Sequence, residues 1–387
     1  MKRLLLVVCL ICLSGCSWMK FWDSDDGDSK ELDIEPAKLV DFNETVELRK
    51  LWSSGGVSDI GAGIGNLRPA LGSDAIYIAD GKGNVKALSI SQGKQLWTND
   101  LDIELTGGVG LGGGQLLLGS VDGDIFVLSE ETGEILWTTR TSSEILSAPA
   151  SNGKQVVVQT QDGHLEAYDA DSGARLWGFE IEAPILTIRG TSSPTITDTM
   201  VMAAFANGKV YAFKAETGLL LWEARVAIPR GRTELERIVD IDGDLLLVDD
   251  VVYAASFQGR LGAFSRGTGR ALWFQDVSSH QTPAYGLSQI YTTDEDDFVS
   301  AYRANSGQPL WTNEQMRYRQ LSSPIVFGGY VAVADNDGYL HLLSQTDGSF
   351  AGRQKVDGSG VSANMLSNGD QLFVLANDGG LTAYGIK

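Results

Sequence analysis

The chain has 387 residues, and its 50 Asp and Glu against 30 Lys and Arg give it a formal net charge of −20. A surface this acidic disfavours binding to nucleic acid and to anionic lipid head groups. The cysteines are Cys9, Cys12 and Cys16, all near the N-terminus. The rest of the chain therefore has neither a disulfide framework nor a thiol nucleophile.

The N-terminus has the pattern of a secretory signal. Lys2 and Arg3 precede an apolar run over residues 4–13, which is too short to span a bilayer. The run ends in Leu13-Ser14-Gly15-Cys16, which resembles the bacterial lipobox. This motif predicts that residues 1–15 are removed and that Cys16 carries a diacylglycerol. The alternative is an ordinary signal peptide with a chance cysteine.

Ser17 follows the lipobox cysteine. Bacterial sorting rules retain lipoproteins in the inner membrane when Asp stands at that position. Because Ser stands there instead, we expect the lipid anchor to attach the protein to the periplasmic face of the outer membrane.

Residues 16–45 are predicted to form a lipidated, flexible tether. The stretch 23–28 is acidic and contains Gly and Ser, so it cannot bury enough apolar surface to order itself. Trp18, Phe21 and Trp22 lie beside the lipidation site. They fit either the membrane interface, where aromatic rings are favoured, or a docking contact with the folded domain, and the sequence leaves both open.

From residue 46 to residue 387 one unit recurs eight times. A turn dipeptide leads to an apolar-x-Ala-apolar segment, then to a glycine turn, then to Leu-Trp. The alternation predicts strands, and Asn-Gly or Asp-Gly predicts tight hairpins. The turn dipeptides begin at Asp80, Asp122, Asp162, Asn207, Gln258, Asp296, Asp337 and Asp378. The predicted fold is all-β, an eight-bladed β-propeller of four-stranded antiparallel blades.

Tryptophan ends six of the units, and its ring is expected to wedge against a neighbouring sheet. The regular spacing excludes generic core tryptophans of a β-sandwich. The seventh unit departs from the pattern, because Gly352 stands at the Trp position with Phe350 nearby. We expect that blade contact to be weaker or filled differently. Apolar strands at 155–158 and 245–248 need cover on both faces, as stacked blades provide.

The two ends of the repeat region complement each other. The last unit stops before its outer strand, and Glu47–Trp52 is an outer strand with no hairpin before it. Pairing residues 47–52 with the blade that contains residues 370–385 is predicted to close the ring and remove its exposed edges.

The segment from Ala167 to Trp177 resembles the repeat of quinoprotein propellers, and the resemblance covers residues 47–387. WD40 repeats fit less well, since no unit ends in Trp-Asp. The resemblance bears on the fold and is weak for activity. Quinone-dependent dehydrogenases use vicinal cysteines, or a dense set of charged side chains with Ca²⁺.

The residues for such chemistry are missing from the sequence. His164, His280 and His341 are scattered, and His164 and His341 flank hairpin glycines, where exposed turn positions are expected. There is no metal-ligand spacing and no phosphate loop. The carboxylates suit turns better than acid–base pairs. We therefore predict no catalytic site, no metal, no cofactor and no enzymatic activity.

Lipobox, acidic tether and eight repeats together resemble the BamB family, lipoproteins of the outer-membrane β-barrel assembly machinery. Two further segments carry the match, Leu186–Pro194 and Arg232–Asp242. They fall in the longest Trp-to-Trp spans, 45 and 51 residues, so they are expected in enlarged loops.

The resemblance implies a scaffold that helps outer-membrane proteins fold and insert. It implies binding to the periplasmic POTRA domains of BamA through Leu186, Ile188, Arg189, Asp240 and Asp242. Unfolded outer-membrane proteins are a further candidate partner. The structural alternative is that Arg189 pairs locally with an acid and Asp240 caps a turn. Two other functions stay open: a quinoprotein-like enzyme or small-molecule sensor using the central channel, and a scaffold for a different envelope complex.

Overall fold

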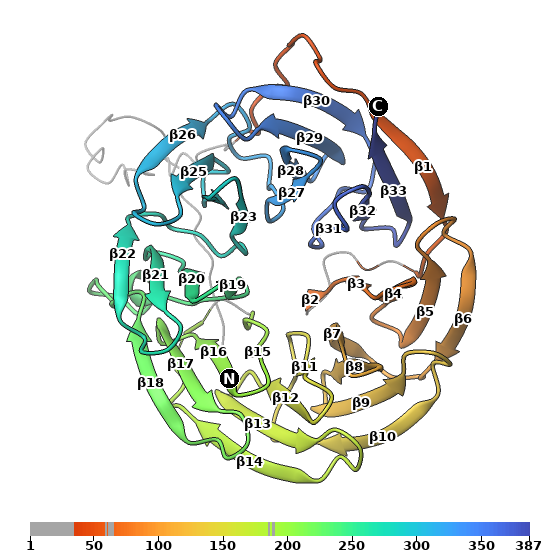
Figure 1. The fold of residues 1–387 in the computed structure, drawn as a ribbon, viewed down its shortest axis with the longest axis vertical. Coiled ribbons are helices and arrows are strands. Elements are labelled where there is room, and N and C mark those ends of the chain that lie inside the picture. Colours follow the sequence, from red (N-terminus) through yellow and green to blue (C-terminus); the bar gives the residue numbers. More distant parts are fainter. Residues whose placement is uncertain (1–34, 59, 61–65, 185, 188–189) are drawn as a thin grey trace, which may run out of the picture. The chain divides into compact units, whose positions relative to one another are not determined.

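The computed structural model describes residues 35–58, 60, 66–184, 186–187 and 190–387. Residues Pro36–Lys387 form one compact unit. In it, eight sheets, each with four antiparallel strands, surround a central channel (Figure 1), as the eight repeats predict. The described part of the chain has no helix long and apolar enough to cross a membrane.

The blades are numbered in chain order, and each is given from its inner to its outer strand. Blade 1 holds β3 (Ala70–Leu71), β4 (Ala75–Ala79), β5 (Asn84–Ser89) and β6 (Gln95–Asp100). Blade 2 holds β7 (Leu105–Gly112), β8 (Gln115–Ser120), β9 (Asp124–Ser129) and β10 (Ile135–Arg140). Blade 3 holds β11 (Ala150–Ser151), β12 (Gln155–Gln159), β13 (His164–Asp169) and β14 (Arg175–Glu180). Blade 4 holds β15 (Thr195–Ile196), β16 (Met200–Phe205), β17 (Lys209–Lys214) and β18 (Leu220–Arg225).

The second half of the ring repeats this order, with one short 3₁₀ helix, η1 (Leu235–Arg237), before blade 5. Blade 5 holds β19 (Leu246–Val248), β20 (Val251–Ala255), β21 (Leu261–Ser265) and β22 (Ala271–Gln275). Blade 6 holds β23 (Ala284–Gly286), β24 (Gln289–Thr293), β25 (Val299–Arg303) and β26 (Pro309–Asn313). Blade 7 holds β27 (Ile325–Phe327), β28 (Tyr330–Ala334), β29 (Tyr339–Ser344) and β30 (Phe350–Lys355). Blade 8 holds β31 (Leu366–Ser367), β32 (Leu372–Leu375), β33 (Leu381–Ile386) and, as its outer strand, β1 (Leu48–Ser54).

The predicted ring closure is confirmed in blade 8. Strand β1 pairs antiparallel with β33, from Leu48 opposite Ile386 to Ser54 opposite Leu381. Figure 1 shows the start of the folded chain beside its end. The first and last strands of the repeat region therefore form one blade, which leaves no open gap in the ring.

Blade 2 carries a strand that the repeat pattern did not predict. Strand β2 (Asn66–Leu67) pairs parallel with the inner strand β7 and makes this sheet five-stranded. Strand β7 is rich in glycine, and a Cβ on Gly110 would lie 1.9 Å from the Pro149 carbonyl oxygen. Glycine is needed at this position because the backbones of blades 2 and 3 touch.

Apolar cores lie between neighbouring blades. Val157 of blade 3 and Val201 of blade 4 belong to one such core. Strand β12 is buried throughout, as its apolar sequence predicts. Strand β19 is only half-buried, so the expectation that 245–248 is covered on both faces holds for Leu245 alone.

Tryptophan joins neighbouring blades at seven interfaces in the described chain. Each indole lies against the turn glycine of the next blade, and its Nε1 donates a hydrogen bond to a backbone carbonyl there. Trp177 of blade 3, for example, lies against Gly218 of blade 4 and donates to the Ala215 oxygen at 2.7 Å. The seven are Trp52, Trp97, Trp137, Trp177, Trp222, Trp273 and Trp311. The predicted wedge is confirmed, but the glycine beneath each ring belongs to the next blade, not to the unit that supplies the Trp.

The interface between blades 7 and 8 is built differently. Residues 36–46, here called the strap, lie along β30 of blade 7. The Thr45 and Val46 backbone N–H groups donate to the Ala351 carbonyl at 2.8 and 3.2 Å. A Cβ on Gly352 would lie 2.8 Å from the Val46 carbonyl oxygen. Gly352 therefore leaves room for the strap where the other units carry Trp, so the contact is filled differently.

The strap also changes the tether boundary. The prediction treats residues 16–45 as a flexible tether, but residues 36–45 belong to the propeller unit, and the strap is hydrogen-bonded at both ends. Its apolar side chains explain the difference, since Phe42 stacks on Phe350 with ring centroids 5.2 Å apart. The signal peptide 1–15, Cys16, Trp18, Phe21 and Trp22 lie outside the described residues.

Candidate functional site

The two segments singled out from the sequence are consecutive connections between blades. Residues 181–194 lead from β14 of blade 3 into β15 of blade 4, and residues 226–245 lead from β18 into β19. Both reach the ring face that carries the Asp-Gly turns, because the Gln161 side chain donates to Thr187 Oγ1 and the Phe257 N–H donates to the Asp240 carbonyl. The predicted enlarged loops therefore lie on one face.

Three of the five predicted binding residues are described. Leu186 is 46% exposed, Asp240 is buried and Asp242 is partly buried. Ile188 and Arg189 lie outside the described residues. Leu186 therefore has the exposure that a binding residue needs, while Asp240 and Asp242 lie deeper, beneath the surface of the connection.

The structure brings the two connections together. A Cβ on Gly190 would lie 3.1 Å from Asp242 Oδ1, so the first connection crosses directly over the second. The Ser193 N–H then donates to Asp244 Oδ1 at 2.9 Å. These contacts join segments about fifty residues apart in sequence, and they make one surface from two loops.

The electrostatics of this surface centre on Asp242. Burial, reinforced by the charge of Asp240, raises the pKa of Asp242 to about 8. Its Oδ2 is buried with no hydrogen-bond donor among the described residues. A carboxyl in these surroundings is held in its neutral form at neutral pH, unless a donor or a cation approaches it.

The sequence did not predict two exposed apolar side chains in the second connection, residues 226–245. Leu235 in η1 is 65% exposed, and Ile228 is 50% exposed. Gln258, in the adjoining hairpin turn of blade 5, donates to the Leu235 carbonyl at 3.5 Å. Together with Leu186 they give the face an apolar component, the composition typical of a binding surface with a polar rim. Neither stands in a repeat position, so no periodic pattern pointed to them.

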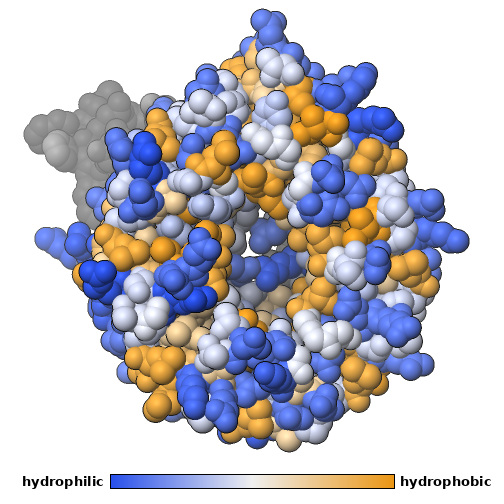
Figure 2. All heavy atoms as spheres, viewed as in Figure 1, coloured by the Kyte–Doolittle hydropathy of each residue, from blue (hydrophilic) through white to orange (hydrophobic). Residues whose placement is uncertain are grey.

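The central channel is crossed by a charged side chain. Arg68, between β2 and β3, forms an ion pair with Asp244 of blade 5, on the opposite side of the ring (Figure 1). Its Nη2 also donates to Ser193 Oγ at 3.0 Å. Figure 2 shows a narrow central opening with hydrophilic side chains in its depth. No sequence pattern pointed to Arg68, because it lies outside the repeated positions.

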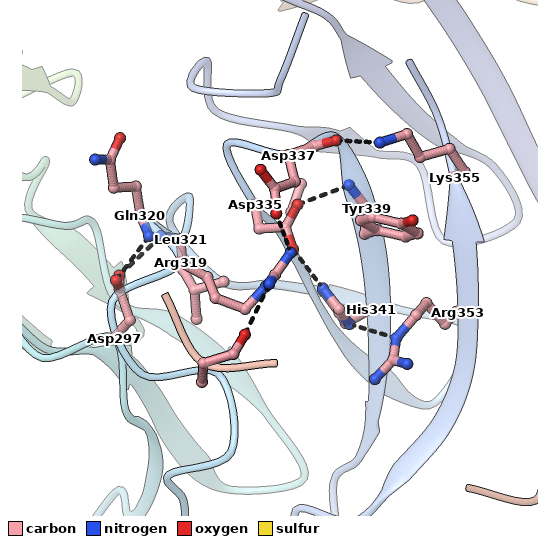
Figure 3. A network of polar contacts seen from close by, with 12 residues as sticks. Asp297, Arg319, Gln320, Leu321, Asp335, Asp337, Tyr339, His341, Arg353 and Lys355 are labelled. Atoms are coloured by element: carbon pink, nitrogen blue, oxygen red, sulfur yellow. Dashed lines mark hydrogen bonds and ion pairs between the residues drawn. The ribbon is translucent and has the colours of Figure 1, made fainter. Parts of the chain in front are cut away.

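A second polar cluster lies in blade 7 (Figure 3). Arg319 is buried and donates to Asp335 and Asp337, in both cases at 2.7 Å. His341 Nε2 lies 3.0 Å from Asp335 Oδ2, and Arg353 Nε donates to His341 Nδ1 at 3.1 Å. The expectation that His341 occupies an exposed turn is wrong, since it is fully buried in β29. Strand alternation turns its side chain inward, and Asp335 supplies the hydrogen bond that burial requires.

The protonation state of this cluster follows from its geometry. An arginine cannot accept a hydrogen bond, so His341 Nδ1 is the acceptor from Arg353 and Nε2 carries the hydrogen toward Asp335. Burial lowers the pKa of His341, against the opposing effect of Asp335. Burial would raise the pKa of Asp335, but hydrogen bonds from His341 and the Tyr339 N–H hold it below its usual value. The pair is therefore a neutral imidazole and a carboxylate at neutral pH.

The cluster fastens the strap. Arg319 Nη1 donates to the Ala37 carbonyl, and Arg353 Nη1 donates to the Val40 carbonyl, both at 2.9 Å. The Arg353 guanidinium also lies 4.8 Å from the Phe42 ring centroid. Both arginines thus join the strap to blade 7, and Arg353 also lines the hollow that the strap borders, together with Tyr339 and Lys355.

Of the other two histidines, only His164 was expected in an exposed turn, and it differs from that expectation. His164 is partly buried between Asp162 and Glu180, at 3.0 and 3.1 Å. His280 is exposed at the surface, although desolvation of its ring by the surrounding chain lowers its pKa, with Asp297 and Glu295 opposing. No group of three or more His, Cys, Asp or Glu side chains in the described chain is arranged to hold a metal ion.

Comparison with known proteins gives one consistent family. A family model described as outer membrane protein assembly factor BamB matches residues 81–313 and 295–387. BamB of Pseudomonas aeruginosa is 50% identical over 390 residues, which cover 100% of this chain and 99% of the relative. The crystal structure of BamB from Moraxella catarrhalis superposes with a TM-score of 0.80 at 27% identity, covering 88% of this chain and 100% of that one. A quinohemoprotein alcohol dehydrogenase from Pseudomonas putida, with a TM-score of 0.67 at 14% identity over 87% of this chain and 76% of that one, shares the fold alone.

Proposed function

The chain belongs to the BamB family of outer-membrane protein assembly factors, and on that basis we propose that it acts as a non-catalytic scaffold in this assembly. Its partner is the set of periplasmic POTRA domains of BamA, and its contact surface is the paired connection around Leu186, Ile188, Arg189, Asp240 and Asp242. The protein is held at the periplasmic face of the outer membrane by lipid on Cys16.

One observation carries the proposed surface. Two connections from different blades are joined by the Gly190–Asp242 contact and the Ser193–Asp244 hydrogen bond. Each of the same two connections also carries an exposed leucine, Leu186 in the first and Leu235 in the second. A joined loop pair that carries exposed apolar side chains and a partly buried carboxyl suits a protein partner that brings an apolar anchor and a hydrogen-bond donor.

The test of the surface is a binding measurement on purified protein with the BamA periplasmic domains. Leu186→Ala is expected to weaken binding by about 30-fold, because truncating a central apolar anchor costs on the order of 2 kcal/mol. Leu219→Ala is the matched control, since Leu219 is 64% exposed next to the Gly218 turn, on the ring face away from the two connections. It should bind like wild type.

Thermal unfolding separates an interface from a structural role. Both variants are expected to melt with the wild-type protein, because neither side chain is in a core. Equal binding by Leu186→Ala and Leu219→Ala would contradict the proposed surface. A lower melting temperature of Leu186→Ala alone would assign that residue a structural role instead.

The lipid anchor has its own test. Mass spectrometry of the mature N-terminus should find a diacylated Cys16 as the first residue. An unmodified N-terminus that begins downstream of Cys16 would contradict the lipoprotein proposal, while leaving the binding surface untouched.

A further inference from the structure

Four residues at corresponding places in consecutive blades form a hydrogen-bonded chain around the channel. Ser193, Asp244, Thr282 and Ser323 stand at the entrances to the inner strands of blades 4, 5, 6 and 7. The N–H of each of the first three donates to the side-chain oxygen of the next, at 2.9, 2.9 and 3.1 Å. We call these four residues the girdle.

Arg68 holds the corresponding place at the entrance to blade 1, but its N–H donates to a backbone carbonyl of blade 2, at Gly108, and not to a side-chain oxygen. Its side chain spans the channel and contacts the girdle at both Asp244 and Ser193. The exposed fractions of the Arg68 and Asp244 side chains are 19% and 20%. Their ion pair is thus largely shielded from water, where such a contact is stronger than on an open surface.

The backbone of Arg68 is hydrogen-bonded to blade 2, on the side of the channel opposite Asp244. Its N–H donates to the Gly108 carbonyl at 2.6 Å, and the Val109 N–H donates to the Arg68 carbonyl at 2.9 Å. Both bonds extend the parallel pairing of β2 with β7, the strand pair that the repeat pattern did not require. The fifth strand of blade 2 therefore provides a rigid base from which the guanidinium reaches the opposite side of the ring.

The two residues that Arg68 contacts directly follow the two proposed binding segments. Ser193 comes shortly after Gly190 in the first connection, and Asp244 comes two residues after Asp242 in the second. One planar guanidinium that contacts both fixes the spacing between the connections, because its donors have a rigid geometry. Asp244 also accepts a hydrogen bond from the Ser193 N–H. Without the Arg68 guanidinium, this bond would be the single polar contact between Asp244 and the described residues of the first connection.

We propose that Arg68 is a positioning residue for the partner-binding surface, a clamp that holds the connections 186–194 and 238–244 in their joined arrangement from across the channel. This inference rests on the proposed function for its consequence in binding. The clamp itself is a property of the free protein. Ordering the two loops beforehand removes part of the entropy cost of binding, so the clamp raises affinity without touching the partner.

The alternative is that Arg68 is a general fold staple. The blades it connects are each held to their neighbours by Trp–Gly contacts, at Gly93, Gly133, Gly269 and Gly307. A clamp and a staple therefore differ in what they change: loss of a clamp loosens two loops, whereas loss of a staple lowers the melting temperature of the ring.

The experiment uses three variants of the full chain, each measured by hydrogen exchange, thermal unfolding and binding to the BamA periplasmic domains. Arg68→Ala removes both contacts, and it is expected to speed exchange in both connections and to weaken binding by about tenfold, the scale of ordering one or two loop side chains. Ser193→Ala removes only the contact at Nη2. Arg68→Lys keeps the charge beside Asp244 but not the fork, so it should match Ser193→Ala and lie between wild type and Arg68→Ala. The melting temperatures of all three should stay close to that of wild type.

The results distinguish a clamp from a fold staple. Unchanged exchange in both connections of Arg68→Ala would overturn the clamp. A large drop in melting temperature in Arg68→Ala, with Arg68→Lys restoring stability, loop protection and affinity together, would make Arg68 a staple and also overturn the clamp. Absence of binding by the wild-type protein would overturn the proposed function instead, and the exchange measurements would still support or refute the clamp.

Discussion

The interfaces between the blades fall into two kinds. At seven of them in the described chain a Trp ring lies over the turn glycine of the next blade and donates one hydrogen bond, whereas the strap covers the interface between blades 7 and 8. The Trp contacts are local, apolar and repeated. The strap contact is long-range and combines stacked rings with the buried pair of Arg319 and Asp335.

The two kinds of interface differ because the ring is closed within blade 8. Blade 8 is made from both ends of the repeat region, so no hairpin turn joins its two outer strands, β33 and β1, and there is no turn glycine on which a Trp from blade 7 could rest. The strap, which leads into β1 of blade 8, lies over Gly352 and fills the space that a Trp side chain fills at the other interfaces. A ring closed by its termini thus needs one interface of a second kind, and the chain supplies it with residues just before the first strand.

The largest expected effect concerns the repeated contact. Trp177→Ala should lower the free energy of unfolding by about 3–5 kcal/mol, because it leaves a cavity in a packed interface and an unpaired Ala215 carbonyl. Urea denaturation measures the loss. Leu176→Ala is the control from the same strand, where the side chain is exposed, and its effect should stay within about 0.5 kcal/mol. Similar losses in both would show that the indole contact does not hold the blades.

Arg319→Ala tests whether this buried arginine holds the strap on blade 7. Removing one partner of a buried ion pair leaves Asp335 uncompensated, so a loss of about 3 kcal/mol is expected, together with rapid proteolysis within residues 36–46. Arg317→Ala is the neighbouring control, since its 3.4 Å pair with Asp296 is exposed and worth less than about 1 kcal/mol. A strap that resists protease in Arg319→Ala would show that the arginine does not fasten it.

Gly352→Trp sharpens the comparison by giving blade 7 the residue that the other units carry. The new side chain must displace the strap, since even its Cβ would meet the Val46 carbonyl, and a destabilisation of about 1–3 kcal/mol is expected. In a chain that lacks residues 36–46 the same substitution should cost less. An equal cost in both backgrounds, by chemical denaturation, would mean that strap and Trp do not compete for this place.

The smallest expected effect is on pH dependence. The folded state holds the pKa of His341 below its unfolded value near 6.5. The folded protein therefore binds fewer protons than the unfolded chain, and stability falls as the pH drops below about 6.5. Melting temperatures of wild type and His341→Gln between about pH 7.5 and about pH 5 test this. Wild type should show the steeper loss, and parallel curves would contradict a buried neutral imidazole. The lowered pKa of Asp335 adds a further loss only at lower pH, below its usual value of 3.8.

The candidate site shows where sequence reasoning stops. Leu186 and Asp242 were predicted as binding residues through family resemblance, and their loops through the long spans between Trp177, Trp222 and Trp273. The burial of Asp240 was not predicted, because nothing in a linear pattern shows that one connection lies over another. Leu235 and Arg68 were missed for the same reason: each stands outside the repeat, and its role depends on a neighbour from another blade.

By itself, the sequence determined the number of blades, their hairpins, the Trp at each regular interface and the closure of the ring by pairing residues 47–52 with the blade that contains residues 370–385. These follow from local turn chemistry and from alternation, which repeat eight times and so reinforce one another. Only the tertiary structure decided the rest: the glycine beneath each Trp, the docking of the strap on blade 7, the burial of His341 and the reach of Arg68 across the channel. Each of these joins residues from different blades or from outside the repeat, and their distance is set by ring geometry, which no local preference encodes.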